Sequence, residues 1–198
     1  MKKIKIYEFL LLITLSSFLP YNLISQEKYE LRCKNNLLEV SYQVGIEQIG
    51  TVEKRNKNDG DVVKYLSSVG LSSGNPYCAA GQYFIFLEAQ RKLKLPPKEI
   101  PLPRTGLANA MYTYAKMKGN KVKYEAKLHD LLVWRKAKTS FGHIERIIEV
   151  QSKGNVITLA FNVMGTSGKE GVFTKKRNIY HPLHRMKVRG LIGFRGIK

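Results

Sequence analysis

The chain has 198 residues, and 43% of them are hydrophobic, which is enough for one domain with a buried core. It carries 34 Lys and Arg against 15 Asp and Glu, a formal charge of +19, and two cysteines. These numbers exclude a disulfide-stapled miniprotein, a disordered chain and a structural zinc module, which needs clustered Cys and His ligands. They predict a basic globular domain whose partner is anionic: nucleic acid, a membrane surface or a cell-wall polymer.

Residues 1–25 have the layout of a secretory signal peptide. Three lysines precede the mostly apolar run Phe9–Leu19, which ends at Pro20. The run is shorter than the roughly 20 residues that span a membrane, and a buried N-terminal helix is the alternative interpretation. We expect a secreted or periplasmic mature chain of residues 26–198. Its net charge is +17, because the leader holds three lysines and one glutamate.

The mature chain divides into a helical half and a strand-rich half. Apolar residues at helical spacing predict helices at Asn35–Gly50, Asp61–Val69, Cys78–Leu93 and Thr105–Lys118. Apolar, β-branched runs bounded by turn residues predict strands at Leu131–Trp134, Ile144–Val150, Val156–Val163, Gly171–Arg177 and Met186–Phe194. Helices followed by antiparallel strands indicate a single α+β domain.

Cys78 is the first candidate for chemistry, because it opens the third predicted helix directly after Tyr77. The N–H groups of a first helical turn are unpaired and its dipole is positive, so this position favours a thiolate and offers donors to an oxyanion. Gly81, one turn further, would let this helix approach the sheet closely. The alternatives are a small buried cysteine, or a Cys33–Cys78 disulfide that an exported chain allows and that would silence the thiol.

A base and an orienting residue are predicted on the hairpin that follows. His143 begins one strand, and if the turn is Gln151–Gly154, the ladder places it opposite Asn162. A slip of one residue in the turn would move Asn162 to the other face. Cys78, His143 and Asn162 would then supply a nucleophile, a base and an orienting group, the general plan of cysteine hydrolases. A structural histidine and a solvent-facing asparagine are the alternatives.

Four segments taken together resemble the CHAP domain, the cysteine- and histidine-dependent amidohydrolases and peptidases of the papain-like, NlpC-related group. They are GNPYCAAGQYF at 74–84, HDLLVW at 129–134, GHIERIIEV at 142–150, and FNV followed by GVFTKKR. The resemblance covers about Leu37 to Phe194. It implies a papain-like fold, with N-terminal helices packed on a C-terminal antiparallel β-sheet. It also implies that Cys78 is the nucleophile, His143 the base, and a polar residue of the next strand the third member.

The resemblance further implies cleavage of amide bonds in peptidoglycan, as an amidase or an endopeptidase. The chain departs from the family at Ala160, because many members carry Glu two residues before the Asn. Asn162 would have to orient His143 alone. A catalytically weak or inactive CHAP-like protein that binds the cell wall is therefore the alternative function.

Three aromatic residues, Tyr77, Trp134 and Phe141, are predicted to line the substrate groove, with core packing as the alternative for each. No cofactor or metal is expected, since the pair His181 and His184 has no third ligand nearby. We expect a monomer whose partner is peptidoglycan and not nucleic acid. An inhibitor or immunity protein is a further partner class that this chemistry allows.

Overall fold

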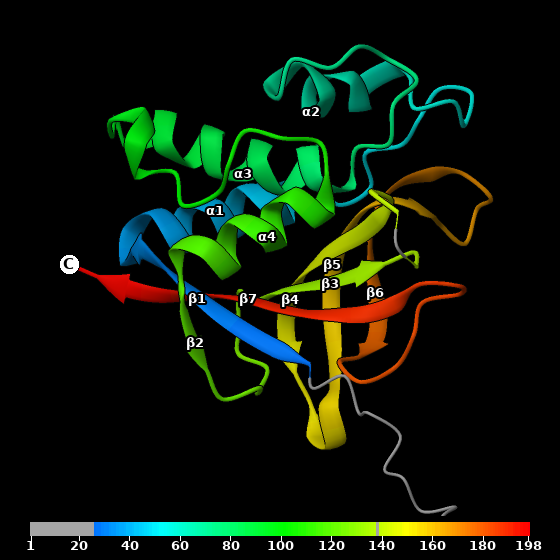
Figure 1. The fold of residues 1–198 in the computed structure, drawn as a ribbon. Coiled ribbons are helices and arrows are strands. Elements are labelled where there is room, and N and C mark those ends of the chain that lie inside the picture. Colours follow the sequence, from blue (N-terminus) through cyan, green and yellow to red (C-terminus); the bar gives the residue numbers. More distant parts are fainter. Residues whose placement is uncertain (1–25, 138) are drawn as a thin grey trace, which may run out of the picture.

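The computed structural model describes residues 26–137 and 139–198, so the predicted signal peptide lies outside the described residues. The domain is α+β, as predicted. Its helices are α1 (Asn35–Glu47), α2 (Val63–Ser68), α3 (Cys78–Lys92) and α4 (Ala108–Lys118). Its strands are β1 (Glu27–Lys34), β2 (Asn120–Val122), β3 (Leu131–Arg135), β4 (Gly142–Val150), β5 (Asn155–Met164), β6 (Glu170–Asn178) and β7 (Lys187–Ile197). Figure 1 shows the helices gathered on one face of the sheet. No helix within the described ranges is long and apolar enough to cross a membrane.

The seven strands form one sheet in the order β2-β1-β7-β3-β4-β5-β6. All neighbours are antiparallel except β1 and β7, which run parallel from Glu27–Gly190 to Lys34–Ile197. The five predicted strands correspond to β3–β7. The strands β1 and β2 were not predicted. Because β1 precedes every helix, the sheet is not purely C-terminal, and that expectation is corrected.

The strand β1 escaped prediction because its sequence, EKYELRCK, is dense in charge. One of those charges is buried: the Nζ atom of Lys28 lies 2.6 Å from the Oδ2 atom of Asp130, and both side chains are almost fully covered. Lys28 also donates a hydrogen bond to the carbonyl of Glu125. A paired and hydrogen-bonded charge can be buried, and this pair lets a polar-looking strand lie inside the sheet.

Both faces of the central strands are covered. The main core lies between the helices and the sheet, and a smaller cluster on the opposite face contains Leu132, Trp134, Ile147, Val156, Ile179 and Leu191. On β4, Arg146 turns toward the helices, where its Nη1 donates to Ser41 of α1. His143 and Glu145 alternate with it and therefore share the other face. The strand thus carries buried polar side chains on both faces.

The strand β5 has one register shift in its pairing with β4 and another in its pairing with β6. The predicted register holds from Glu145–Ala160 to Ile147–Thr158 and then shifts by one residue toward the turn. A second shift, between β5 and β6, falls between Phe161 and Val163. Asn162 lies at this second bulge with a φ of 61°, a left-handed conformation that asparagine tolerates better than most residues.

The helix α3 lies close against β5, as predicted from Gly81. A Cβ atom at this position would collide with the ring of Phe161. The absent side chain therefore lets the first turn of α3 approach the sheet.

Candidate active site

Cys78 is the first residue of α3 and is buried. The first bond of this helix runs from the N–H of Gly81 to the carbonyl of Tyr77, at 2.8 Å. The N–H groups of Cys78, Ala79 and Ala80 precede that bond and so have no acceptor within the helix. The position therefore combines a thiol with unpaired donors, as the sequence predicts.

The thiol is free. Cys33 and Cys78 are both unbonded and buried in separate parts of the fold, Cys33 on β1 and Cys78 on α3. The alternative of a Cys33–Cys78 disulfide is therefore wrong for this structure. Burial raises the pKa of Cys33 to about 12, which keeps that thiol protonated.

His143 lies beside Cys78 at the start of β4. The Sγ atom of Cys78 is 4.0 Å from the carbonyl oxygen of Gly142, the residue that precedes His143. On its other side His143 pairs with Trp134 of β3, with ring centroids 6.0 Å apart. The structure thus brings together the two residues that the sequence predicts as nucleophile and base, 65 positions apart in the chain.

A carboxylate that was not predicted from the sequence, that of Glu145, holds the imidazole of His143. The Nε2 atom of His143 donates to Oε1 of Glu145 at 2.9 Å, and Glu145 is fully buried. Thr158 donates to the other carboxylate oxygen at 2.5 Å, and Arg177 donates from Nε at 2.9 Å and from Nη2 at 2.8 Å. The signal was the spacing His-x-Glu on a strand, which places both side chains on one face.

Electrostatics favour a protonated His143. Burial alone would lower its pKa, but the hydrogen bonds and charges of Cys78 and Glu145 raise it to about 10. Burial likewise works against the charge of Glu145, yet His143 and Arg177 lower the pKa of this carboxyl to about 2. The buried carboxylate of Glu145 balances the charge of the imidazolium beside Cys78.

Asn162 does not orient His143, and this prediction is corrected. Its Oδ1 accepts the backbone N–H of Tyr77 at 3.2 Å, and its Nδ2 donates to Oδ1 of Asn58 at 2.9 Å. The reason is the bulge, because a left-handed residue leaves the alternation of the strand and turns its side chain elsewhere. Asn162 instead fixes the residue immediately before Cys78.

The three predicted groove aromatics have different environments. Phe141 is 66% exposed and lines a cavity together with Cys78. Tyr77 is fully buried and stacks on Tyr65, so its side chain belongs to the core and the groove prediction for it is corrected. Trp134 is also buried and donates from Nε1 to the carbonyl of His181 at 3.1 Å. Only Phe141 of the three faces the thiol's cavity.

Two cavities flank the pair Cys78 and His143. The first, which we name the nucleophile cavity, has a volume of about 440 Å³ and is lined by Cys78 with Leu71, Leu107, Phe141 and their neighbours. The second, the histidine cavity, measures about 380 Å³; its lining includes His143, Asn162, Lys175, Arg177, His184 and Met186. The thiol opens to one cavity and the imidazole to the other, so a bound chain could lie across both.

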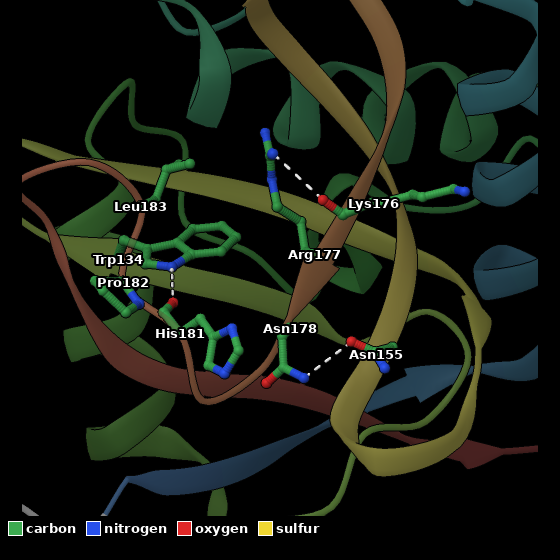
Figure 2. A pocket seen from close by; sticks show the side chains of 8 residues that line it. All are labelled: Trp134, Asn155, Lys176, Arg177, Asn178, His181, Pro182 and Leu183. Carbon is green, nitrogen blue, oxygen red and sulfur yellow. Dashed lines mark hydrogen bonds between the residues drawn. The ribbon is translucent and has the colours of Figure 1, made fainter.

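A third cavity, of about 310 Å³, lies between β6 and the segment that follows it. Figure 2 shows Trp134 on one side of it, above His181, and Asn178 bonded to Asn155 on the other. Arg177 lines both this cavity and the histidine cavity. Trp134 therefore lies in the wall of this cavity, separate from the one that holds Cys78.

No family model, no curated protein and no solved structure matches the chain. Within the described residues, no group of three or more His, Cys, Asp or Glu is placed to hold a metal ion. The groups available for chemistry are a thiol, an imidazole with its carboxylate, and backbone N–H donors. These are the components of acyl transfer through a covalent cysteine intermediate.

Proposed function

We propose that the protein is an exported cysteine hydrolase of the CHAP type, papain-like in plan, that cleaves amide bonds of peptidoglycan. The observation that carries the proposal is the arrangement of Cys78 at the start of α3 beside His143, whose ring is bonded to the buried Glu145. The resemblance of four segments to CHAP domains supports the substrate class. The net charge of the mature chain, +17, suits an anionic wall polymer.

In the proposed mechanism the Cys78 thiolate attacks the carbonyl carbon of an amide, and the carbonyl electrons move to oxygen. N–H groups at the start of α3 stabilise this oxyanion. When the C–N bond breaks, the imidazolium of His143 gives its proton to the leaving nitrogen, and a thioester stays on Cys78. His143, now neutral, takes a proton from water. The resulting hydroxide attacks the thioester and releases the carboxylic acid and the thiolate.

Glu145 acts on His143 and not on the substrate. A buried carboxylate that accepts a hydrogen bond from the Nε2–H group fixes the ring orientation and stabilises the imidazolium, a role known from hydrolase triads. Because Thr158 and Arg177 hold both carboxylate oxygens, the ring is oriented by a group that is itself fixed. These contacts support an active enzyme over the weak or inactive protein that the departure at Ala160 favours.

The test is digestion of purified peptidoglycan by residues 26–198, with new amines counted and products identified by mass spectrometry. We expect soluble fragments with free amino groups from the wild type and none from Cys78→Ala. Unchanged release by that variant would overturn the role of Cys78. Sedimentation with peptidoglycan without turnover would instead support the wall-binding alternative, and DNA binding that falls steeply with salt would indicate a nucleic-acid partner.

A further inference from the structure

We propose that the nucleophile cavity is the subsite for the acyl side of the substrate, and that it selects an uncharged apolar residue there. The proposal rests on the proposed function. It adds the direction in which the substrate lies across the site and the kind of residue that is preferred on the acyl side. A cysteine hydrolase must place the acyl group at its thiol and the leaving amine at the acid that protonates it. The structure separates these two positions into two cavities.

The direction of the bound substrate follows from the cavities that Cys78 and His143 line. Cys78 lines the nucleophile cavity and His143 lines the histidine cavity. The proton that the amine needs comes from His143, so the amine side must lie toward the histidine cavity. The acyl side, which stays bonded to sulfur after the amine has left, then extends into the nucleophile cavity.

The specificity follows from the lining of the nucleophile cavity. Leu71, Leu107 and Phe141 all line it, with 36%, 51% and 66% of their surfaces exposed. Large apolar side chains that converge on one cavity beside a nucleophile mark a binding surface. Among the described residues that line it, Arg104 is the one with a charge, and it is a cation. The cavity therefore favours an aliphatic group and opposes a lysyl group.

The wall that carries Phe141 is held in place from α4. The side-chain amide of Asn109 donates to the carbonyls of Ser140 and Phe141, at 2.9 and 3.0 Å. On the other side of Asn109, Nη1 of Arg189 donates to its Oδ1 at 3.0 Å. An exposed aromatic ring on a fixed loop contributes apolar surface at a small entropy cost.

The experiment measures how fast acetyl-dipeptidyl chloromethyl ketones alkylate Cys78, with mass spectrometry as the readout. In this reaction the Cys78 sulfur bonds to the methylene carbon and chloride leaves. We expect the dileucyl reagent to react roughly tenfold or more faster than the diglycyl reagent, and the dilysyl reagent to be slowest. Equal rates for the dileucyl and dilysyl reagents would overturn the inference.

Matched variants locate the preference. Phe141→Ser and Leu107→Ser should reduce the dileucyl advantage, whereas Met117→Ser, which changes a 73% exposed side chain of α4, should not. An unchanged preference in both cavity variants would contradict the assignment. Iodoacetamide, which needs no subsite, is the control for the thiol: its failure to label Cys78 would count against the proposed function, and normal labelling without any peptide preference would count against this inference alone.

Discussion

Glu145 and Ala160 face each other as Cα partners across β4 and β5. Ala160 is the position at which the resemblance to CHAP domains leads one to expect a glutamate, and Glu145, its partner on the neighbouring strand, accepts the hydrogen bond of the His143 imidazole. The short side chain of Ala160 is fully buried there. The proposed site thus holds a carboxylate on β4, opposite the position on β5 where the resemblance implies one.

Glu145→Gln should therefore slow hydrolysis more than any other conservative change outside Cys78 and His143. The amide keeps the shape but cannot balance the imidazolium, and we expect a loss of roughly 100-fold in kcat. The measurement is peptidoglycan turnover, followed by the pH dependence of Cys78 alkylation. Glu149→Gln, an exposed change on the same strand, is the control. Full activity in Glu145→Gln would show that the carboxylate has no role in the chemistry.

The imidazole of His143 should titrate with a pKa far above the usual value of 6.5. Because Cys78 and Glu145 raise it to about 10, this histidine stabilises the folded state fully below pH 6.5, and that contribution is lost as the pH rises through 10. The contribution of Glu145 runs the other way: it is present above pH 4.5 and is lost as the pH falls toward 2. NMR titration of the imidazole checks the first direction, and Cys78→Ala should lower the midpoint. A midpoint near 6.5 in the wild type would contradict the ion pair.

Asn162 should act on stability and on the placement of Cys78, with no effect on the pKa of His143. Asn162→Gly keeps the left-handed φ but loses the bond to the N–H of Tyr77, and should cost about 1 kcal/mol. Asn162→Ala adds backbone strain and should cost about 2 kcal/mol. Urea unfolding measures both. If either variant shifted the His143 titration, Asn162 would be an orienting residue after all.

The two thiols should react very differently. Cys33 is buried and its pKa is raised to about 12, so it should resist iodoacetamide in the folded protein, whereas Cys78 should be alkylated within minutes. Peptide mapping of the labelled protein identifies the site. Unfolding in urea without reductant should expose two reactive thiols. A count of zero would mean that the native protein carries the disulfide that the structure lacks.

Asn109→Ala should loosen the segment 139–141 without unfolding the domain. The variant leaves the carbonyls of Ser140 and Phe141 without their side-chain donor. Faster amide hydrogen exchange at these positions, together with a raised KM and a nearly constant kcat, is the expected result. Asn120→Ala, at an exposed position in β2, provides the comparison. Unchanged exchange rates would show that the segment 139–141 keeps its conformation without the hydrogen bonds from Asn109.

The sequence was sufficient for the helices, the five later strands and the two residues that carry the proposed chemistry. Periodicity located α3 and β4, and the chemistry of a helix start pointed to Cys78. The residue that orients His143 could not be predicted from these patterns: Asn162 was expected, and Glu145 has this position in the structure. The bulge at Asn162 takes this side chain out of the alternation of the strand, and no local pattern in the sequence reveals the bulge.

The first strand illustrates a second limit. Charge density in β1 predicts exposure, yet Lys28 is buried because Asp130, more than 100 positions away, neutralises it. Glu145 could have been proposed from its spacing to His143. Its burial and its hydrogen bonds to Thr158 and Arg177 depend on β5 and β6 lying beside β4 in the sheet, which is tertiary information.

The pairing of β1 with β7 also sets the order in which the domain can be completed. β7 separates β1 from β3, so the sheet has a gap in its middle until residues 187–197 have been synthesised and are free to insert. Contacts between the two ends of a chain close late and slowly. A chain whose last strand has not yet been synthesised cannot assemble this sheet, so the domain should complete its fold only after β7 is free to insert between β1 and β3.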